Sequence, residues 1–74
     1  MIYDIEQVGK RVKAERKKQG LTQMQLAVRS EISLRTLRSV EQSEKYPNLF
    51  TILQICKGLD ISLADLFEDE DDGQ

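Results

Sequence analysis

The sequence contains no histidine, no tryptophan and a single cysteine among its 74 residues. The lone Cys56 cannot form an internal disulfide, and without histidine there is no credible zinc-ligand set, so a reducing compartment fits best. No apolar run approaches the roughly 20 residues that span a bilayer, and the N-terminus lacks a secretory apolar core. We therefore expect a cytoplasmic protein with no metal, no cofactor and no membrane partner.

The same absences argue against catalysis. There is no histidine to act as a general base, and no glycine-rich phosphate loop or nucleotide motif occurs. Thr22 and Ser33 stand just before helical patterns, where hydroxyls cap helices, and Cys56 lies on an apolar helix face. We expect that the protein is not an enzyme.

Length and charge limit the architecture. A chain of 74 residues buries enough apolar surface for one core only. The formal net charge is −2, but residues 1–45 carry ten Lys or Arg against six Asp or Glu, whereas residues 46–74 carry one against seven. The N-terminal part is therefore basic and can face a polyanion. Residues 68–74 hold five acids and no apolar anchor, which predicts an acidic, disordered tail after a domain that spans residues 1–67.

The spacing of apolar residues along the chain predicts helices and no strands. Apolar residues recur at helical intervals in residues 4–18 and 23–29, and Ser33 caps a third helix. Residues 43–48, which hold the only proline, are predicted as a loop. A fourth helix carries Leu49, Ile52, Leu53 and Cys56 and ends near Gly58, and Ser62 caps a short fifth helix through Phe67. The predicted fold class is all-α, a compact five-helix domain.

The second and third helices form a recognisable unit. They are short, a turn of about three residues joins them, and the third has an apolar inner face and a polar outer face, which is the geometry that enters a major groove. Over residues 8–67 the chain resembles the phage repressor/Cro-type (XRE-like) helix-turn-helix family of lambda-repressor-like DNA-binding domains. The resemblance rests on the combined order and spacing of several landmarks: Val8-Gly9, Arg16, Leu21-Thr22-Gln23, Leu26-Ala27, Ile32-Ser33, Leu37, Val40-Glu41, Pro47, Leu49, Ile61-Ser62-Leu63 and Leu66-Phe67.

The chain departs from the family at two turn positions. Glu31 and Ser43 stand where glycine is common in the family. We expect Glu31 to adopt a backbone conformation that is less comfortable for a residue with a side chain, or a slightly different turn.

The resemblance implies which residues contact DNA. The start and outer face of the third helix contact bases, and Arg35 is the best candidate for two hydrogen bonds to a guanine. Leu34 cannot hydrogen-bond and would touch a thymine methyl. The implied base contacts are Leu34, Arg35, Arg38 and Ser39. The implied phosphate contacts are Gln23, Thr36, Gln42 and Lys45, although Thr36 could equally be a neutral surface residue and exposed arginines often serve only as solvated surface.

Two charged side chains face inward. Arg16 follows Ile5 by eleven residues on the apolar stripe of the first helix, and Glu41 follows Leu37 by four on the inner face of the third. A buried charge is costly unless it is paired. We therefore predict a structural salt bridge between Arg16 and Glu41.

Phe50 lies opposite Ile52 and Cys56 on the helical wheel, so it would be exposed in a monomer. We expect it to form a dimer or partner surface together with Ile61, Leu63 and Phe67. A two-fold dimer would place two recognition helices one DNA turn apart on a palindromic operator.

The predicted function is a sequence-specific, double-stranded DNA-binding transcriptional regulator, most simply a homodimeric repressor. An activator or a restriction-modification controller would use the same residues. The alternative is an antitoxin or protein-interaction module that binds a partner, such as a toxin, through the fourth and fifth helices or the acidic tail. The outer face of the third helix separates these classes, because only a DNA-binding protein needs it.

Overall fold

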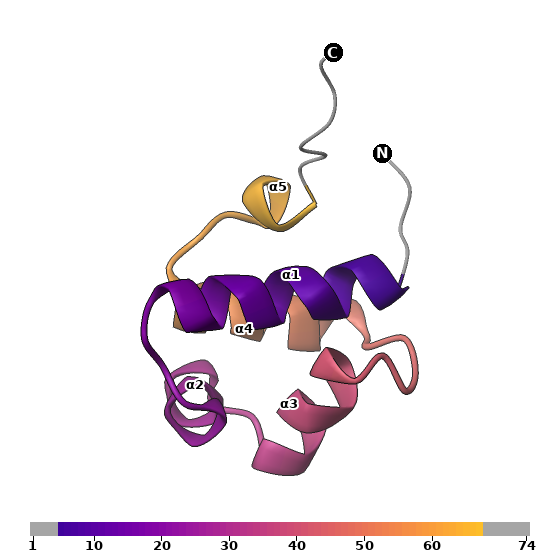
Figure 1. The fold of residues 1–74 in the computed structure, drawn as a ribbon. Helices are drawn as coiled ribbons and strands as arrows, with labels where there is room; N and C mark the ends of the chain where they lie inside the picture. The colour runs from indigo at the N-terminus through magenta and orange to yellow at the C-terminus, as the bar shows by residue number, and fades with distance from the viewer. Residues whose placement is uncertain (1–4, 68–74) are drawn as a thin grey trace.

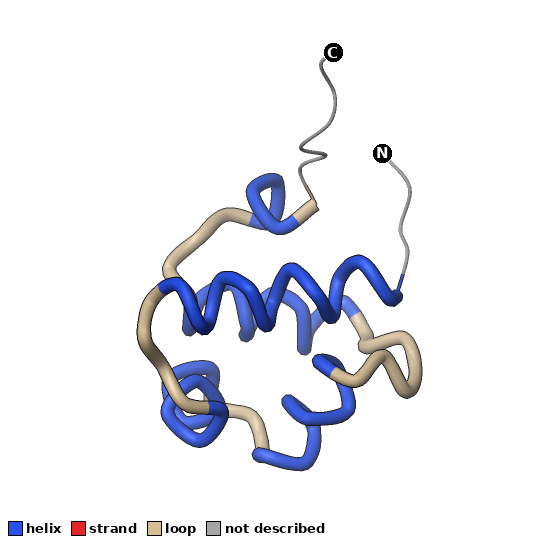
Figure 2. Tube along the Cα trace, in the orientation of Figure 1, coloured by secondary structure: helices blue, strands red, loops and turns tan. Residues whose placement is uncertain are grey.

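The computed structural model describes residues 5–67, and within that range all regular secondary structure is helical (Figures 1 and 2). This confirms the predicted all-α class and five-helix order. The predicted acidic tail, 68–74, lies outside the described residues. The helices are α1 (Ile5–Lys18), α2 (Gln23–Ser30), α3 (Leu34–Glu41), α4 (Leu49–Leu59) and α5 (Leu63–Leu66).

Side-chain caps set where α2 to α5 begin. Thr22 and Ser62 each form the expected reciprocal box, in which the cap hydroxyl accepts from the third helical residue and that residue's side chain accepts from the cap N–H. Ser33 caps α3, as predicted. Asn48 caps α4 by accepting from Thr51 N at 2.8 Å, whereas the sequence predicts it as part of the loop 43–48.

Three residues with side chains, Glu31, Ser43 and Asp60, adopt left-handed backbone at turns of the described range. Glu31 has φ 59° and Ser43 has φ 60°, and these are the two positions where the family commonly carries glycine. The expectation of an uncomfortable backbone at Glu31 is confirmed. Each such residue costs about 1–2 kcal/mol relative to right-handed backbone, so the packing on either side of these turns must hold them in place.

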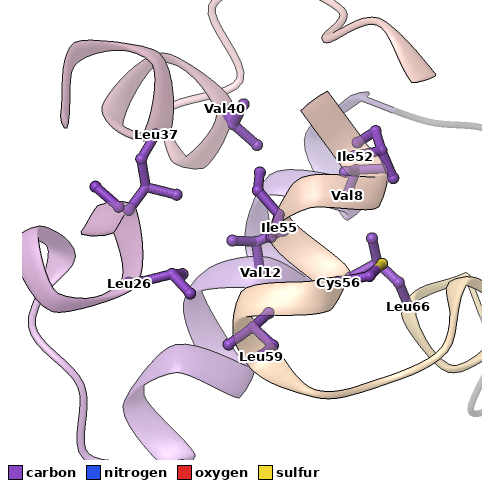
Figure 3. Close-up of a cluster of buried hydrophobic side chains, with 11 residues drawn as sticks. Val8, Val12, Leu26, Leu37, Val40, Ile52, Ile55, Cys56, Leu59 and Leu66 are labelled. Carbon is purple, nitrogen blue, oxygen red and sulfur yellow. The ribbon is translucent and has the colours of Figure 1, made fainter. Parts of the chain in front are cut away.

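The helices enclose one apolar core. α2 packs mainly against α4, α3 packs against α1, and α5 packs against both α1 and α4. Figure 1 shows α2 and α3 on one side of α1 and α4, with α5 on the other. All five helices contribute to the core (Figure 3), which consists of Val8, Val12, Leu26, Ala27, Leu37, Val40, Ile52, Ile55, Cys56, Leu59 and Leu66.

The buried face of α4 differs from the apolar stripe that the sequence predicts, which consists of Leu49, Ile52, Leu53 and Cys56. Ile52 and Cys56 are buried as part of that stripe, but Leu49 and Leu53 are 63% and 45% exposed. Ile55 and Leu59 take their places in the core. The helix also continues one residue beyond Gly58.

Gly58 explains the orientation of α4. A Cβ at this position would collide with Ser30 Oγ and would lie 3.0 Å from Ser30 N, so the missing side chain lets α2 approach α4 closely. That contact turns Ile55 and Leu59 inward and leaves Leu49 and Leu53 at the edge. The Ser30 hydroxyl is fully buried there and has no hydrogen-bond partner among residues 5–67.

Candidate nucleic-acid interface

α3 is held by its inner face and presents its outer face. Leu37 and Val40 are buried in the core, which anchors the helix against α1 and α2. Arg35 and Arg38 are exposed on the opposite face, while Leu34 and Ser39 are half-buried beside them. The structure thus brings the four predicted base-contacting residues together on one helix, with the two arginines outermost.

An open groove of about 580 Å³ runs between α3, the loop 42–48 and the start of α4. It joins the predicted base contacts Arg35 and Ser39 to the predicted phosphate contacts Thr36 and Lys45. Asn48 and Thr51 add polar side chains to its wall, and Glu44 adds one carboxylate. The groove therefore carries both cations and neutral hydrogen-bonding groups, the side-chain types that contact phosphates and base edges.

The predicted salt bridge between Arg16 and Glu41 is present and is bidentate. Arg16 Nε donates to Glu41 Oε2 at 2.7 Å, and Arg16 Nη2 donates to Glu41 Oε1 at 3.1 Å. Arg16 Nη1 also donates to the Leu21 carbonyl at 2.9 Å. The two side chains are only 10% and 2% exposed. This pair fastens the C-terminal end of α3 to α1.

Gln23 lies between that ion pair and the outer face of α3. Its Nε2 donates to Glu41 Oε1 at 3.1 Å, and its Oε1 accepts from Arg38 Nε at 3.3 Å. The phosphate contact predicted for Gln23 from the sequence did not include these links. Gln23 is 15 residues from Arg38 and 18 from Glu41, so no local spacing signals the contacts.

The other predicted phosphate contacts lie near α3 as well. The Thr36 hydroxyl accepts from Ser33 Oγ at 2.8 Å, and Thr36 is half-buried. Gln42 is exposed at the C-cap of α3, where its backbone N–H donates to the Arg38 carbonyl. Lys45 is exposed on the following loop. All three side chains therefore border the exposed face of α3.

The predicted partner surface divides into two parts. Phe50 is 67% exposed, as expected, and lies next to exposed Leu49 and one turn from exposed Leu53 on α4. Ile61, Leu63 and Phe67 are half-buried and pack against the core instead. The exposure of Leu49 and Leu53 was not predicted from the sequence. We call Leu49, Phe50 and Leu53 the α4 apolar patch.

Two kinds of feature are absent from residues 5–67. No helix in that range is long and apolar enough to cross a membrane. Within the same range, no group of three or more cysteine or acidic side chains is placed to hold a metal ion. The Cys56 thiol is buried in the core, and this burial, with a smaller contribution from the Asp65 carboxylate, raises its pKa above the ordinary value.

Comparisons with known proteins agree with this geometry. The helix-turn-helix family model matches residues 12–66. The restriction-modification controller protein C.AhdI from Aeromonas hydrophila is similar, with a TM-score of 0.83 and 31% identity over 86% of this chain and 97% of that one. No curated protein sequence matches the chain at a significant level.

Two other solved structures are similar at lower identity. The wild-type restriction-modification controller protein C.Esp1396I has a TM-score of 0.82 and 25% identity over 92% of this chain and 88% of that one. The clp gene regulator ClgR from C. glutamicum has a TM-score of 0.80 and 25% identity over 90% and 87%.

Proposed function

The chain belongs to the phage repressor/Cro-type helix-turn-helix family of DNA-binding transcriptional regulators, and we propose that it binds an operator as a homodimer and represses transcription. One observation carries the proposal. Arg35 and Arg38 are exposed on a helix whose inner face is fixed by core residues and by the bidentate Arg16–Glu41 pair. A rigid helix with an exposed polar face is what readout in the major groove requires.

The proposed base contacts follow from side-chain chemistry. Arg35 donates two hydrogen bonds to O6 and N7 of a guanine, and Arg38 contacts a second base pair. Ser39 can donate to or accept from a base edge. Leu34 packs against a thymine methyl.

The proposed phosphate contacts set the register of α3 in the groove. The second N–H of the Gln23 amide, the hydroxyl of Thr36, the amide of Gln42 and the ammonium of Lys45 donate to phosphate oxygens. The Lys45 contact makes affinity fall as salt rises, because a cation that neutralises a phosphate releases counterions from the DNA. None of the four contacts carries sequence information itself.

The α4 apolar patch supports dimerisation. Three large apolar side chains that are 45–67% exposed on one helix are costly to leave in water. In the proposed dimer they pack against a second copy, to which the exposed parts of half-buried Ile61, Leu63 and Phe67 also contribute, and the operator is a palindrome with half-sites one DNA turn apart.

The relatives favour one specific role. C.AhdI and C.Esp1396I are restriction-modification controller proteins, so control of restriction-modification genes is the variant of the proposal that they support. Whichever genes are regulated, the protein acts by binding in the cytoplasm of a prokaryotic cell, without catalysis. The competing proposal is an antitoxin or protein-interaction module that uses the α4 apolar patch to bind a toxin.

The experiment that tests the proposal is selection of binding sites from random duplex DNA, followed by anisotropy titration of the selected duplex and a scrambled one at two salt concentrations. We expect a palindromic site that binds two chains about a thousandfold or more tighter than the scramble. Weak binding that is indifferent to sequence and disappears with added salt would favour the protein-interaction module instead.

A further inference from the structure

A series of polar side chains runs from the core to the surface of α3. Arg16 donates to both oxygens of Glu41, and Glu41 Oε1 also accepts from Gln23 Nε2 at 3.1 Å. The Oε1 of Gln23 then accepts from Arg38 Nε at 3.3 Å. Exposed Arg38 is thus linked through one residue, Gln23, to a buried, doubly bonded ion pair.

The geometry points to Gln23 as a positioning residue that orients Arg38 to read one base pair of the operator. This inference rests on the proposed DNA-binding function. An arginine has five N–H donors, and the bond to Gln23 occupies only the one on Nε. The edge formed by the two Nη groups stays available, and that edge matches O6 and N7 of a guanine.

Charge fixes the orientation of the Gln23 amide. The Glu41 carboxylate is 2% exposed, and when ionised it only accepts hydrogen bonds, so it selects the amide nitrogen. The Arg38 guanidinium only donates, so it selects the amide oxygen. A flipped amide would put oxygen against carboxylate and NH₂ against guanidinium. Gln23 can therefore bridge these two groups in one orientation only, and Arg38 is held accordingly.

Arg35 offers an internal comparison. It is exposed on the same helix, but its side chain makes no hydrogen bond or ion pair with any residue that the structure describes. An unheld arginine loses more rotamer freedom when it binds a base. The base preference that Arg38 supplies therefore depends on Gln23, whereas the preference that Arg35 supplies does not.

A phosphate contact by Gln23 is compatible with this role but predicts a different loss. Removing a phosphate contact alone weakens binding to all sequences about equally, and because the Gln23 amide is neutral its loss leaves the salt dependence nearly unchanged. Removing a positioning residue changes the preference at one base pair. Base preference at each position of the operator therefore separates the two effects.

The test uses the full chain and the selected duplex with each base pair substituted in turn. Arg38→Ala identifies the base pair that Arg38 reads, as the position where discrimination falls about tenfold. We expect Gln23→Met to lower discrimination at that same position by about threefold or more, and to leave the position read by Arg35 within about twofold of the parent. Gln7→Met, the same substitution at an exposed site on α1, is the matched control and should change neither position.

Additional measurements keep the test decisive. The double variant Gln23→Met/Arg38→Ala should lose no more discrimination at that position than Arg38→Ala does. If Gln23→Met does not fold, Gln23→Asn takes its place. Its side chain is one methylene too short to bridge Glu41 and Arg38, so it should show the same loss of discrimination at the position read by Arg38. In the free parent protein, ¹⁵N relaxation should show the Arg38 Nε–H to be more ordered than the Arg35 Nε–H.

The inference and the proposed function fail differently. If the parent selects a defined site and Gln23→Met weakens every duplex evenly, or if Arg38 Nε is as mobile as Arg35 Nε, the positioning role is overturned and the regulator stands. If Arg38→Ala lowers affinity without altering any base preference, the positioning role is likewise overturned. If the parent selects no site at all, the proposed function itself fails.

Discussion

Arg16 and Glu41 are 25 residues apart in sequence, yet their side chains meet in two parallel hydrogen bonds of 2.7 and 3.1 Å. The pair is nearly buried and joins the first helix to the end of the helix that we propose contacts DNA. Burial makes the attraction between the two charges strong and also makes either charge expensive if it stands alone. The orientation of α3 therefore depends on both residues together.

Removing the charge of one partner in this pair should strongly destabilise the fold. Glu41→Gln keeps the shape of the side chain but leaves the Arg16 charge buried, and we expect a loss of about 3–5 kcal/mol in the free energy of unfolding, measured by urea denaturation. Replacing both residues, as Arg16→Met with Glu41→Leu, should recover most of that loss because no charge remains buried. A loss under about 1 kcal/mol in Glu41→Gln would contradict a tightly coupled pair.

The buried thiol of Cys56 predicts a pH dependence. Its pKa is raised from the ordinary value of 9.0, chiefly by burial and further by Asp65. The unfolded chain therefore loses the thiol proton first, so the stability that the protonated thiol contributes is complete below pH 9.0 and falls as the pH rises through the folded pKa.

The matched variant is Cys56→Ala, which removes this group and keeps all other titrating residues. Urea unfolding at about pH 7 and about pH 10 should show a larger fall in stability for the parent than for the variant. Equal falls would mean that the thiol does not titrate differently in the two states.

The contact between Ser30 and Gly58 predicts opposite effects of two small changes. Ser30→Ala removes a buried hydroxyl that has no partner in the described part of the chain, and should stabilise the fold by up to about 1 kcal/mol. Gly58→Ala puts a methyl group against Ser30 and should destabilise the fold by about 1–3 kcal/mol. In thermal melts the double variant Ser30→Ala/Gly58→Ala should be more stable than Gly58→Ala, because the Ser30 hydroxyl is one of the atoms that the new methyl group would meet. A double variant no more stable than Gly58→Ala would show that the Ser30 backbone alone limits the approach.

The α4 apolar patch predicts the oligomeric state. Phe50→Ser should weaken the proposed dimer by roughly tenfold or more, because burying a large apolar side chain is worth about 1.5–3 kcal/mol. Val28→Ser is the matched control, since Val28 is 68% exposed on α2, outside this patch. Sedimentation equilibrium across a range of concentrations measures both. A parent chain that stays monomeric, or equal effects of the two substitutions, would remove the patch from the interface.

Sequence alone was sufficient for features with a local cause. Thr22, Ser33 and Ser62 cap helices because a hydroxyl three residues before a free N–H is positioned by the turn itself. The Arg16–Glu41 pair was predictable for a different reason: two charges on apolar stripes have few ways to be satisfied.

Features set by the packing of helices were not predictable. The pattern of α4 contains two overlapping stripes, and the close approach at Gly58 decides that Ile55 and Leu59, rather than Leu49 and Leu53, enter the core. The bonds of Gln23 to Glu41 and Arg38 depend on how α2 and α3 are placed, which no spacing along the chain encodes.

The most direct test of the account is the base preference of Arg35→Ala on the selected duplex, with Lys13→Ala as a control that removes a positive charge from the exposed surface of α1. Anisotropy titrations against each single base-pair substitution should show that Arg35→Ala loses discrimination at one position, by about 1–3 kcal/mol, while Lys13→Ala keeps the parental preference at every position. If Arg35→Ala and Lys13→Ala instead lower affinity evenly across all duplexes, α3 does not read sequence, and the account of this protein as an operator-specific regulator is wrong.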